Sequence, residues 1–218
     1  MNLFFLFIFS VLLWSRSRII YKNKNDKIQY IPGLLYCVYS YPFILNKLQC
    51  FILMQESIPY LQTSKVNDLD GSDKSNLHIL RNSYSCAMRN HVTDYIHKFA
   101  SKITGYPLEY HEDTQVTFYK EGGHYSLHFD KNEQHPRLKT RICTLIFYLN
   151  ECDGGETEFP YIQVKIKPEQ GHCVLFWNGM DFQIKESCHR ACPVLKGTKW
   201  IAQQWIHSVP YMTLYGPK

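Results

Sequence analysis

Short runs of β-branched and aromatic residues, separated by turn-forming sequences, fill the C-terminal half of this 218-residue chain. Such runs favour β-strands, and the Gly, Pro, Asn and Asp residues between them favour chain reversals. Many short strands at this spacing indicate a sandwich or jelly roll rather than a parallel α/β sheet. We expect strands at 115–119, 141–148, 163–166, 172–176 and 199–206, and turns at Asp153-Gly-Gly, Lys167-Pro-Glu-Gln-Gly, Asn178-Gly and Lys196-Gly.

A first helix is expected before the strands. Asn46 and Gln49 form a capping-box pattern, which opens a helix that runs through about Ser57. The apolar side chains available to face the rest of the protein are Leu48, Ile52 and Phe51.

A second helix is predicted by an apolar stripe with helical spacing and by the stop signals after it. We interpret it as a support helix that packs against the sheet. His91 and His97 lie on this helix, and we expect them to be surface residues rather than ligands. The stripe and its stop signals are Val92, Ile96, Phe99, Ile103, Gly105 and Pro107.

The length of the chain fits one domain, with no room for a separate binding module. We divide it into an apolar signal-like or anchor segment plus a basic linker at 1–30, an N-terminal helical support region at 31–110, and a jelly-roll core at 111–210. The single domain as a whole is expected at about 43–207.

The N-terminal apolar run extends from Leu3 to Trp14. It is shorter than the ~20 residues of a membrane-spanning helix but fits the core of a signal peptide. No basic residue precedes it, no small-x-small cleavage site follows it, and Arg16 and Arg18 come directly after it. A cleaved signal, an anchor and a buried segment therefore all stay open. We expect the endoplasmic reticulum lumen, or membrane association through residues 3–14, with the cytosol as the alternative.

The positive charge is concentrated near the N-terminus. Residues 16–27 contain five Lys or Arg and one Asp, a surplus of four within the net charge of +5 of the whole chain. We interpret this cluster as a solvated linker or juxtamembrane segment. No stripe of basic and aromatic residues indicates nucleic-acid binding.

Eight cysteines are compatible with an oxidising compartment but do not establish one. Cys143 and Cys173 lie inside apolar runs, where a free thiol packs as a small hydrophobic group. Cys188, His189 and Cys192 form a tight cluster that lacks the second paired motif of a structural zinc site. A disulfide between Cys188 and Cys192 is the alternative.

A His-Phe-Asp triplet and a later histidine form a candidate metal site. Residues i and i+2 of a strand share one face, so His128 and Asp130 can reach one ion while Phe129 turns away into packing. A later strand must then return His189, which lies 59 positions after Asp130. Two imidazoles and a carboxylate are the facial triad that holds Fe(II) and leaves the opposite coordination positions open. The triplet alone is a weak signal in a chain with ten histidines.

The surrounding motifs strengthen this interpretation. They are YKEGGHYSLHFD (119–130), RICTLIFYLN (141–150), GGETEFP (154–160), KPEQG (167–171), HRACPV (189–194) and GTKW (197–200). Together they resemble the prolyl 4-hydroxylase branch of the Fe(II)- and 2-oxoglutarate-dependent dioxygenases. The resemblance covers about residues 43–207 and is strongest from Tyr119 onward.

The resemblance implies a fold and a set of site residues. The fold would be mainly β with flanking helices (α+β): a double-stranded β-helix, which is a jelly roll, supported by N-terminal helices. His128, Asp130 and His189 would bind Fe(II), and Lys199, ten positions after His189, would receive the distal carboxylate of 2-oxoglutarate. A lysine here favours the prolyl 4-hydroxylases over lysyl hydroxylases and nucleic-acid demethylases, which typically use arginine.

Three further side chains are candidate hydrogen-bond partners of 2-oxoglutarate: Tyr119, Thr144 and Tyr148. Thr144 and Tyr148 would share one face of a strand, and the alternative for both is a hydroxyl satisfied within the core. The tryptophans Trp177, Trp200 and Trp205 are expected in the core, with the lining of a substrate groove as the alternative for one of them.

The implied activity is hydroxylation of a peptidyl proline by O2, coupled to oxidative decarboxylation of 2-oxoglutarate to succinate and CO2. Ascorbate is expected as a further cofactor. The partner would be a proline-containing peptide or protein in an extended or polyproline II conformation, whose preformed shape costs little entropy to bind. The identity of that substrate and the oligomeric state are left open.

Two departures from the family pattern and three alternative functions accompany this interpretation. Arg81-Asn-Ser83 replaces a typical Arg-Thr-Ser, and Ile31-Pro-Gly-Leu-Leu-Tyr replaces the usual Trp-Pro-Arg at the start of the domain. The alternatives are a non-catalytic peptide-binding subunit, a dioxygenase acting on another class of substrate, and a metal-binding jelly roll with unrelated chemistry, such as a cupin. The last alternative has no need for Lys199.

Overall fold

The computed structural model describes residues 38–67, 73–74 and 79–215. The expectations for the 1–30 segment, for its apolar run and for the sequence that begins at Ile31 lie outside these residues. Within the part of the chain that the structure describes, no helix is long and apolar enough to cross a membrane.

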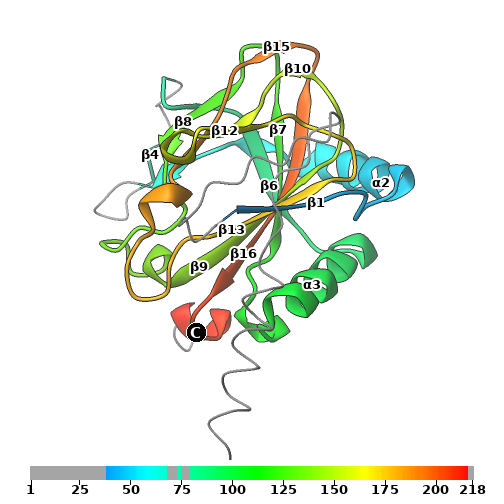
Figure 1. The fold of residues 1–218 in the computed structure, drawn as a ribbon. Helices are drawn as coiled ribbons and strands as arrows, with labels where there is room; N and C mark the ends of the chain where they lie inside the picture. Colours follow the sequence, from blue (N-terminus) through cyan, green and yellow to red (C-terminus); the bar gives the residue numbers. More distant parts are fainter. Residues whose placement is uncertain (1–37, 68–72, 75–78, 216–218) are drawn as a thin grey trace, which may run out of the picture.

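Two antiparallel sheets form the centre of the structure (Figure 1). Strands that are distant in sequence lie side by side in both sheets, as expected for a jelly roll. In order across the larger sheet, the strands are β1 (Val38–Tyr41), β13 (Cys173–Trp177), β9 (Arg141–Tyr148), β16 (Lys199–His207), β7 (Thr114–Tyr119), β6 (Tyr84–Met88) and β2 (Gln62–Thr63). The smaller sheet consists of β12 (Val164–Ile166), β11 (Thr157–Phe159), β14 (His189–Ala191), β8 (His124–His128) and β5 (Arg81–Asn82).

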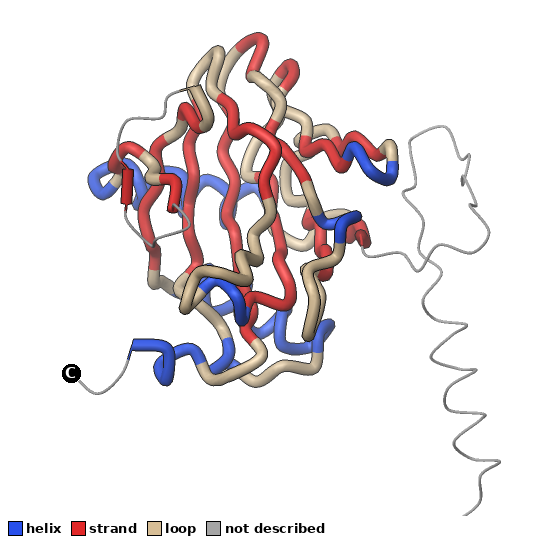
Figure 2. The backbone as a smooth tube through the Cα atoms, turned by 90° about the vertical axis from the view of Figure 1, so that its left-hand side faces the viewer, coloured by secondary structure: helices blue, strands red, loops and turns tan. Residues whose placement is uncertain are grey.

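Shorter elements connect these sheets. Two further strand pairs and several single turns of 3₁₀ helix lie at their ends, and Figure 2 shows the strands running side by side through the middle of the molecule. The strand pairs are β10 (Asp153–Gly154) with β15 (Val194–Lys196) and β3 (Val66–Asn67) with β4 (Asp73–Lys74). The 3₁₀ turns are η1 (Ile58–Tyr60), η2 (Leu108–Tyr110), η3 (Leu138–Thr140), η4 (Pro160–Ile162), η5 (Lys185–Ser187) and η6 (Tyr211–Tyr215).

The five strands expected from the sequence are confirmed to within one residue at each end, and the turns predicted at 167–171 and 178–179 lie between strands. The turn predicted at Asp153-Gly-Gly is wrong in part, because Asp153–Gly154 forms strand β10, and Lys196 ends β15. Gly171 illustrates why one of these turns requires glycine. Its φ is +83°, and a Cβ there would lie 2.1 Å from the carbonyl oxygen of Leu45.

The central strand β9 separates two layers of hydrophobic core. Alternate side chains of a strand point to opposite faces. Cys143, Leu145 and Phe147 therefore pack with the helices, while Ile146 and Tyr148 pack with residues of the smaller sheet. All five side chains are buried, so this strand contributes to both layers.

Helix α2 (Lys47–Ser57) begins with the capping box expected from the sequence, in which Asn46 and Gln49 exchange hydrogen bonds. The predicted apolar face is wrong for Leu48 and Phe51, which are 65% and 54% exposed, whereas Ile52 is half-buried and packs against the core. Cys50, Leu53 and Ser57 face the sheet instead. The helix is apolar on most sides, so the sequence pattern indicated its start but did not select the buried face.

Helix α3 (His91–Thr104) agrees better with the sequence. Val92 and Ile96 are fully buried, and the helix ends at Gly105, whose φ of +80° is left-handed. His91 is exposed as expected, whereas His97 is half-buried and contacts Thr114 Oγ1 through Nε2 at 3.1 Å. Figure 1 shows α2 and α3 on the same side of the larger sheet.

The region 31–110, expected to be helical support, also supplies strands to both sheets. β1, β2 and β6 belong to the larger sheet and β5 to the smaller one. The sheet order therefore crosses the expected boundary at residue 110.

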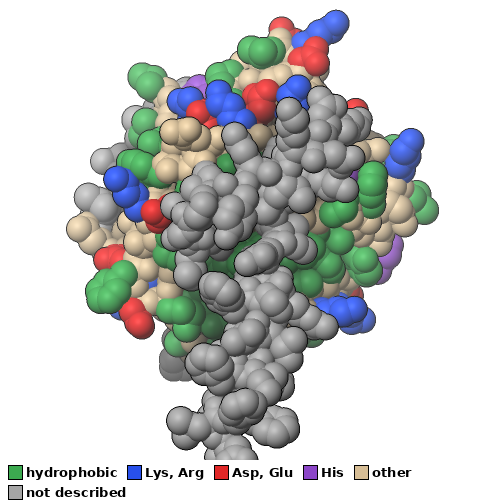
Figure 3. All heavy atoms as spheres, viewed as in Figure 1, with side chains coloured by type: hydrophobic (Ala, Val, Ile, Leu, Met, Phe, Trp, Pro, Cys, Tyr) green, Lys and Arg blue, Asp and Glu red, His purple; other side chains and the backbone are tan. Residues whose placement is uncertain are grey.

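Around the rim of the face in Figure 3, basic and acidic side chains of the described residues are interspersed.

The cap of α3 generates a stability prediction. The Asn90 side chain accepts hydrogen bonds from the backbone of Val92 at 3.0 Å and of Thr93 at 2.9 Å. Asn90→Ala should lower the free energy of unfolding by about 1 kcal/mol, because two N–H groups lose their acceptor. Asn90→Ser, which restores an acceptor, should recover most of the loss in urea unfolding. Equal stability of Asn90→Ala and the unmodified protein would contradict this.

Candidate active site

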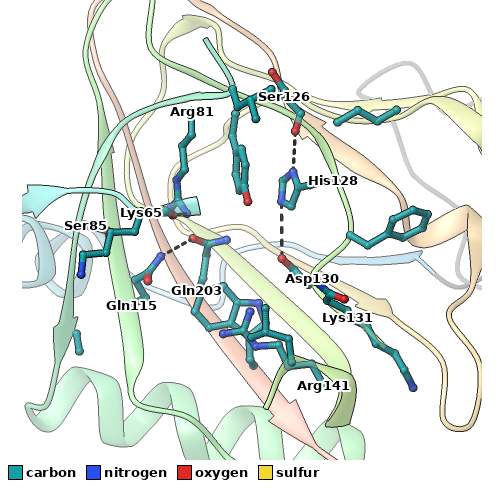
Figure 4. A pocket seen from close by; sticks show the side chains of 18 of the residues that line it. Lys65, Arg81, Ser85, Gln115, Ser126, His128, Asp130, Lys131, Arg141 and Gln203 are labelled. Carbon is teal, nitrogen blue, oxygen red and sulfur yellow. Dashed lines mark hydrogen bonds and ion pairs between the residues drawn. The ribbon is translucent and has the colours of Figure 1, made fainter. Parts of the chain in front are cut away.

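A pocket of about 830 Å³ opens beside the ends of β8 and β16. Its lining includes His128 and Asp130 from the predicted metal site, together with Arg81, Arg141 and Trp205. Figure 4 shows His128 between Ser126 and Asp130, with Arg141 on the other side of the carboxylate. Most of the side chains that line the pocket are polar or charged, so the pocket offers many hydrogen-bonding groups to a ligand.

The three predicted metal ligands lie together. One nitrogen of His128, one oxygen of Asp130 and one nitrogen of His189 are all within 4.8 Å of one another. The return of His189 on a later strand is confirmed, because His189 of β14 pairs in register with His128 of β8. The three side chains can thus hold one metal ion on a single side.

The expected strand position of Asp130 is wrong. β8 ends at His128, and Asp130 lies in the bend that follows. Phe129 is half-buried and lines the pocket instead of turning into the core. The bend carries the Asp130 carboxylate to β9, where Thr144 Oγ1 donates a hydrogen bond of 2.7 Å to Oδ2.

Both histidine rings are oriented by a backbone carbonyl. His128 Nδ1 lies 2.8 Å from the Ser126 carbonyl oxygen, and His189 Nδ1 lies 2.9 Å from that of Ser187. A carbonyl oxygen only accepts, so Nδ1 carries a hydrogen in both rings, and Nε2 is the nitrogen left to bind a metal. Burial, with repulsion from His189, lowers the pKa of His128 to about 3, so this imidazole is neutral at physiological pH.

The Asp130 carboxylate is ionised. Burial alone would raise its pKa, but the nearby His189, His128 and Arg141 outweigh burial and lower the pKa. A neutral His128 beside an ionised, buried carboxylate is the combination of protonation states that a divalent cation requires. The residues present therefore fit Fe(II).

Lys199 is an unpaired buried cation. It is 1% exposed, and Nζ has no hydrogen-bond partner among the described residues. Nζ lies 5.3 Å from the ring centre of Tyr119 and 5.8 Å from that of Tyr148. Burial lowers the pKa of Lys199 to about 8. A buried ammonium without an anion is costly, so this position fits a carboxylate ligand.

The hydroxyls of Thr144, Tyr148 and Tyr119 all have protein partners. Thr144 donates to Asp130, and Tyr148 donates to Thr157 Oγ1 at 2.7 Å. Tyr119 forms a hydrogen bond with Ser83, and burial raises the pKa of its phenol to about 12. Thr144 and Tyr148 lie on the same face of β9, as expected from their spacing.

A buried charge cluster in the wall of the pocket was not predicted from the sequence. Arg141 Nε and Nη2 donate to the two carboxylate oxygens of Glu112 at 2.5 and 2.9 Å. His207 Nε2 lies 2.7 Å from the same carboxylate, and the guanidinium lies 4.0 Å from the ring centre of Trp205. Burial would raise the pKa of Glu112, but Arg141 and His207 lower it to about 2. The sequence did contain one signal for this cluster, because Arg141 is a charged residue at the start of an otherwise apolar strand.

Arg81, the first residue of the atypical Arg-Asn-Ser motif, also lines the pocket. Its Nε donates to Ser83 Oγ at 3.0 Å, and its guanidinium lies 4.5 Å from the ring centre of Tyr125. Among the tryptophans, Trp205 lines the pocket, while Trp177 and Trp200 are half-buried against the helical core layer. Trp205 is also 6% exposed, as expected for a core residue, and a role in a substrate groove stays a prediction.

The disulfide considered between Cys188 and Cys192 is not formed. Cys192 Sγ donates to Glu158 Oε2 at 3.3 Å instead. In the described part of the chain, free thiols are present at Cys50, Cys86, Cys143, Cys152, Cys173, Cys188 and Cys192.

Comparison with known proteins identifies the family. Residues 114–207 match the family described as the 2OG-Fe(II) oxygenase superfamily. Prolyl 4-hydroxylase 2 of Arabidopsis thaliana is 30% identical over 225 residues, which cover 90% of this chain and 74% of that relative. The chain belongs to the prolyl 4-hydroxylases.

Two more members of the prolyl 4-hydroxylase branch extend the comparison. The human prolyl 4-hydroxylase subunit alpha-1 is 27% identical over 75% of this chain and 33% of its own length, so the chain spans a third of that subunit. The crystal structure of a viral collagen prolyl hydroxylase from Paramecium bursaria Chlorella virus-1, in complex with 2-oxoglutarate, has a TM-score of 0.64. It is 28% identical, with 80% of this chain and 97% of that chain covered.

The unpaired Lys199 makes the ligand-free protein sensitive to pH. Its pKa is about 8 in the folded state, against 10.5 for an unperturbed lysine. Between these values the unfolded state binds more protons, so stability rises with pH across the window. Lys199→Met should therefore raise the unfolding free energy at pH 7 by up to about 3 kcal/mol, and the gain should shrink toward pH 10.

Urea unfolding at both pH values measures this, with Lys196→Met as the control at an exposed lysine. A loss of stability in Lys199→Met at pH 7 would show that the ammonium already has an anionic partner in the ligand-free protein.

Proposed function

We propose that this protein is an Fe(II)- and 2-oxoglutarate-dependent dioxygenase that hydroxylates proline in a peptide or protein. The observation that carries the proposal is the combination of a three-residue metal site with the buried, unpaired ammonium of Lys199 on strand β16 of the larger sheet. A cupin-like metal protein would have no reason to bury that charge.

In this proposal His128, Asp130 and His189 hold Fe(II), and Lys199 pairs with the distal carboxylate of 2-oxoglutarate. Tyr119 and Tyr148 flank the ammonium, so their rings form the walls around that carboxylate. The iron and cosubstrate, when bound, supply the oxidation, in which one atom of O2 enters the substrate and the other enters succinate as CO2 is released. Ascorbate is proposed as the reductant that maintains Fe(II).

The pocket wall supplies donors for a peptide backbone. An extended or polyproline II segment exposes carbonyl oxygens that have no partner within the segment. Trp205 lines the pocket, and its indole N–H has no hydrogen-bond partner among the described residues. The guanidinium of Arg141 is held over this indole by Glu112. In this proposal Arg141, which has N–H groups beyond the two that bind Glu112, is the donor for a substrate carbonyl, while the buried Trp205 ring excludes water.

The test is turnover on a panel of proline-rich peptides, followed by mass spectrometry for the addition of one oxygen atom and by succinate formation. His189→Ala should lose both iron and turnover, because two remaining ligands hold Fe(II) poorly against water. Lys199→Ala should keep its iron but need at least about tenfold more 2-oxoglutarate, since it loses a buried charge-assisted bond. Lys199→Arg should retain part of the activity.

Each outcome separates the alternatives. Succinate formation without oxygen transfer to any proline would indicate a dioxygenase for another class of substrate. Iron binding and peptide binding without succinate formation would indicate a non-catalytic peptide-binding subunit. An unchanged 2-oxoglutarate requirement in Lys199→Ala would refute the assignment of Lys199.

We infer from the apolar run Leu3 to Trp14 that the protein enters the endoplasmic reticulum or attaches to its membrane. A reporter fused to residues 1–30 should accumulate in that compartment. A matched fusion with Leu6→Asp and Leu12→Asp should stay in the cytosol, because the substitutions interrupt the apolar run. Diffuse cytosolic signal from both fusions would contradict the assignment.

A further inference from the structure

The three candidate metal ligands differ in what orients them. Each histidine contacts a backbone carbonyl two residues earlier in its own segment, Ser126 for His128 and Ser187 for His189. Asp130 instead depends on side chains from elsewhere in the chain. Thr144 Oγ1 donates to Asp130 Oδ2 at 2.7 Å, and Asn178 Nδ2 donates to Thr144 Oγ1 at 2.9 Å. These residues form a chain of two hydrogen bonds, the Asp130–Thr144–Asn178 chain.

The direction of both bonds follows from counting hydrogens. An ionised carboxylate only accepts, so the single hydroxyl hydrogen of Thr144 points to Asp130. The Thr144 oxygen must then accept from Asn178, which fixes the amide with Nδ2 toward Thr144. Asp130 is 5% exposed, and Thr144 and Asn178 are 0% exposed, so water does not compete for these groups.

The two carboxylate oxygens of Asp130 therefore have different neighbours. Oδ2 is occupied by Thr144, whereas Oδ1 lies 3.7 Å from His128 Nε2, on the side of the ligand cluster. Turning the carboxylate to present both oxygens to one ion would break the Thr144 bond. Thr144 also has no second hydrogen with which to bind 2-oxoglutarate.

Asn178 is itself held firmly at the end of β13. Its backbone N–H donates to the Ile142 carbonyl at 2.8 Å, and its carbonyl accepts from Ile184 at 2.9 Å. Lys131, the residue after Asp130, donates from Nζ to the Gly179 and Met180 carbonyls at 3.1 and 2.6 Å. Both ends of the Asp130–Thr144–Asn178 chain are therefore tied to the same loop.

We propose that Thr144 and Asn178 are positioning residues that make Asp130 a ligand through one oxygen only and so set the affinity of the site for its metal. The proposal rests on the proposed function in one respect: it takes His128, Asp130 and His189 as the ligands of the metal. A one-oxygen carboxylate leaves more coordination positions open for cosubstrate than a two-oxygen carboxylate does. Residues behind metal ligands typically change metal affinity about 10- to 100-fold when they are removed.

The test measures metal binding alone, without 2-oxoglutarate or peptide. Purified protein is titrated with Mn(II) and, anaerobically, with Fe(II), and the absorption spectrum of bound Co(II) reports the ligand geometry. Thr144→Val keeps the side-chain shape but removes the hydroxyl, so affinity should fall about 10- to 100-fold with an altered Co(II) spectrum. Thr144→Ser restores the hydroxyl and should recover the affinity and the spectrum.

The control is Thr114→Val. Thr114 is fully buried and donates to Gln204 Oε1 at 2.7 Å, so the variant loses an equivalent bond outside the metal site. It should bind metal with unchanged affinity, which separates positioning from a general loss of stability. Wild-type affinity and spectrum in Thr144→Val would overturn the proposal, as would an equal loss in Thr114→Val.

Asn178→Leu tests the second bond. Alone it should weaken metal binding, and in the Thr144→Val background it should cause no further loss, because the two residues act in series. Additive losses would show that Asn178 does not act through Thr144. If Thr144→Val does not fold, unchanged affinity in Asn178→Leu would overturn the proposal. Normal metal binding without proline hydroxylation would refute the proposed function and leave this inference intact.

Discussion

The antiparallel pairing of β8 with β14 is the contact on which the site depends. It sets His189 opposite His128, although the two residues are far apart in the sequence. A slip of one residue in this register would turn one imidazole to the other face of the smaller sheet. The larger sheet then supplies the remaining groups, with Thr144 on β9 and Lys199 on β16. The site therefore depends on how the two sheets pack, because the smaller sheet carries both histidines and the larger sheet carries Thr144 and Lys199.

The features that follow from local sequence were predictable. Strand runs, helix caps and most of the turn glycines each depend on neighbouring residues, and the structure agrees with them. Contacts between distant segments were not predictable. The position of Asp130 beyond the strand depends on Thr144, and the charge cluster of Arg141 depends on Glu112 and His207. The buried face of α2 was missed because its apolar residues surround the helix, so burial was decided by the sheet.

Arg141 and Lys199 both carry a buried positive charge, and the desolvation cost of that charge is offset in different ways. Arg141 is paired with Glu112 inside the protein, and this pair is complete without a ligand. Lys199 has no such partner among the described residues and bears the cost of desolvation. Arg141 is therefore a fixed part of the wall, whereas Lys199 gains its compensation only when an anion binds. The same physical rule thus distinguishes a structural charge from a binding charge.

Strand β9 separates two kinds of sequence constraint. One set of alternate side chains, such as Leu145 and Phe147, packs against the helices, while Thr144 and Tyr148 face the site. A substitution on the helical face changes the packing of the hydrophobic core and leaves the metal ligands unchanged. Substitutions on the two faces can therefore be selected separately. Alternate residues along β9 affect either the packing of the fold or the chemistry of the site.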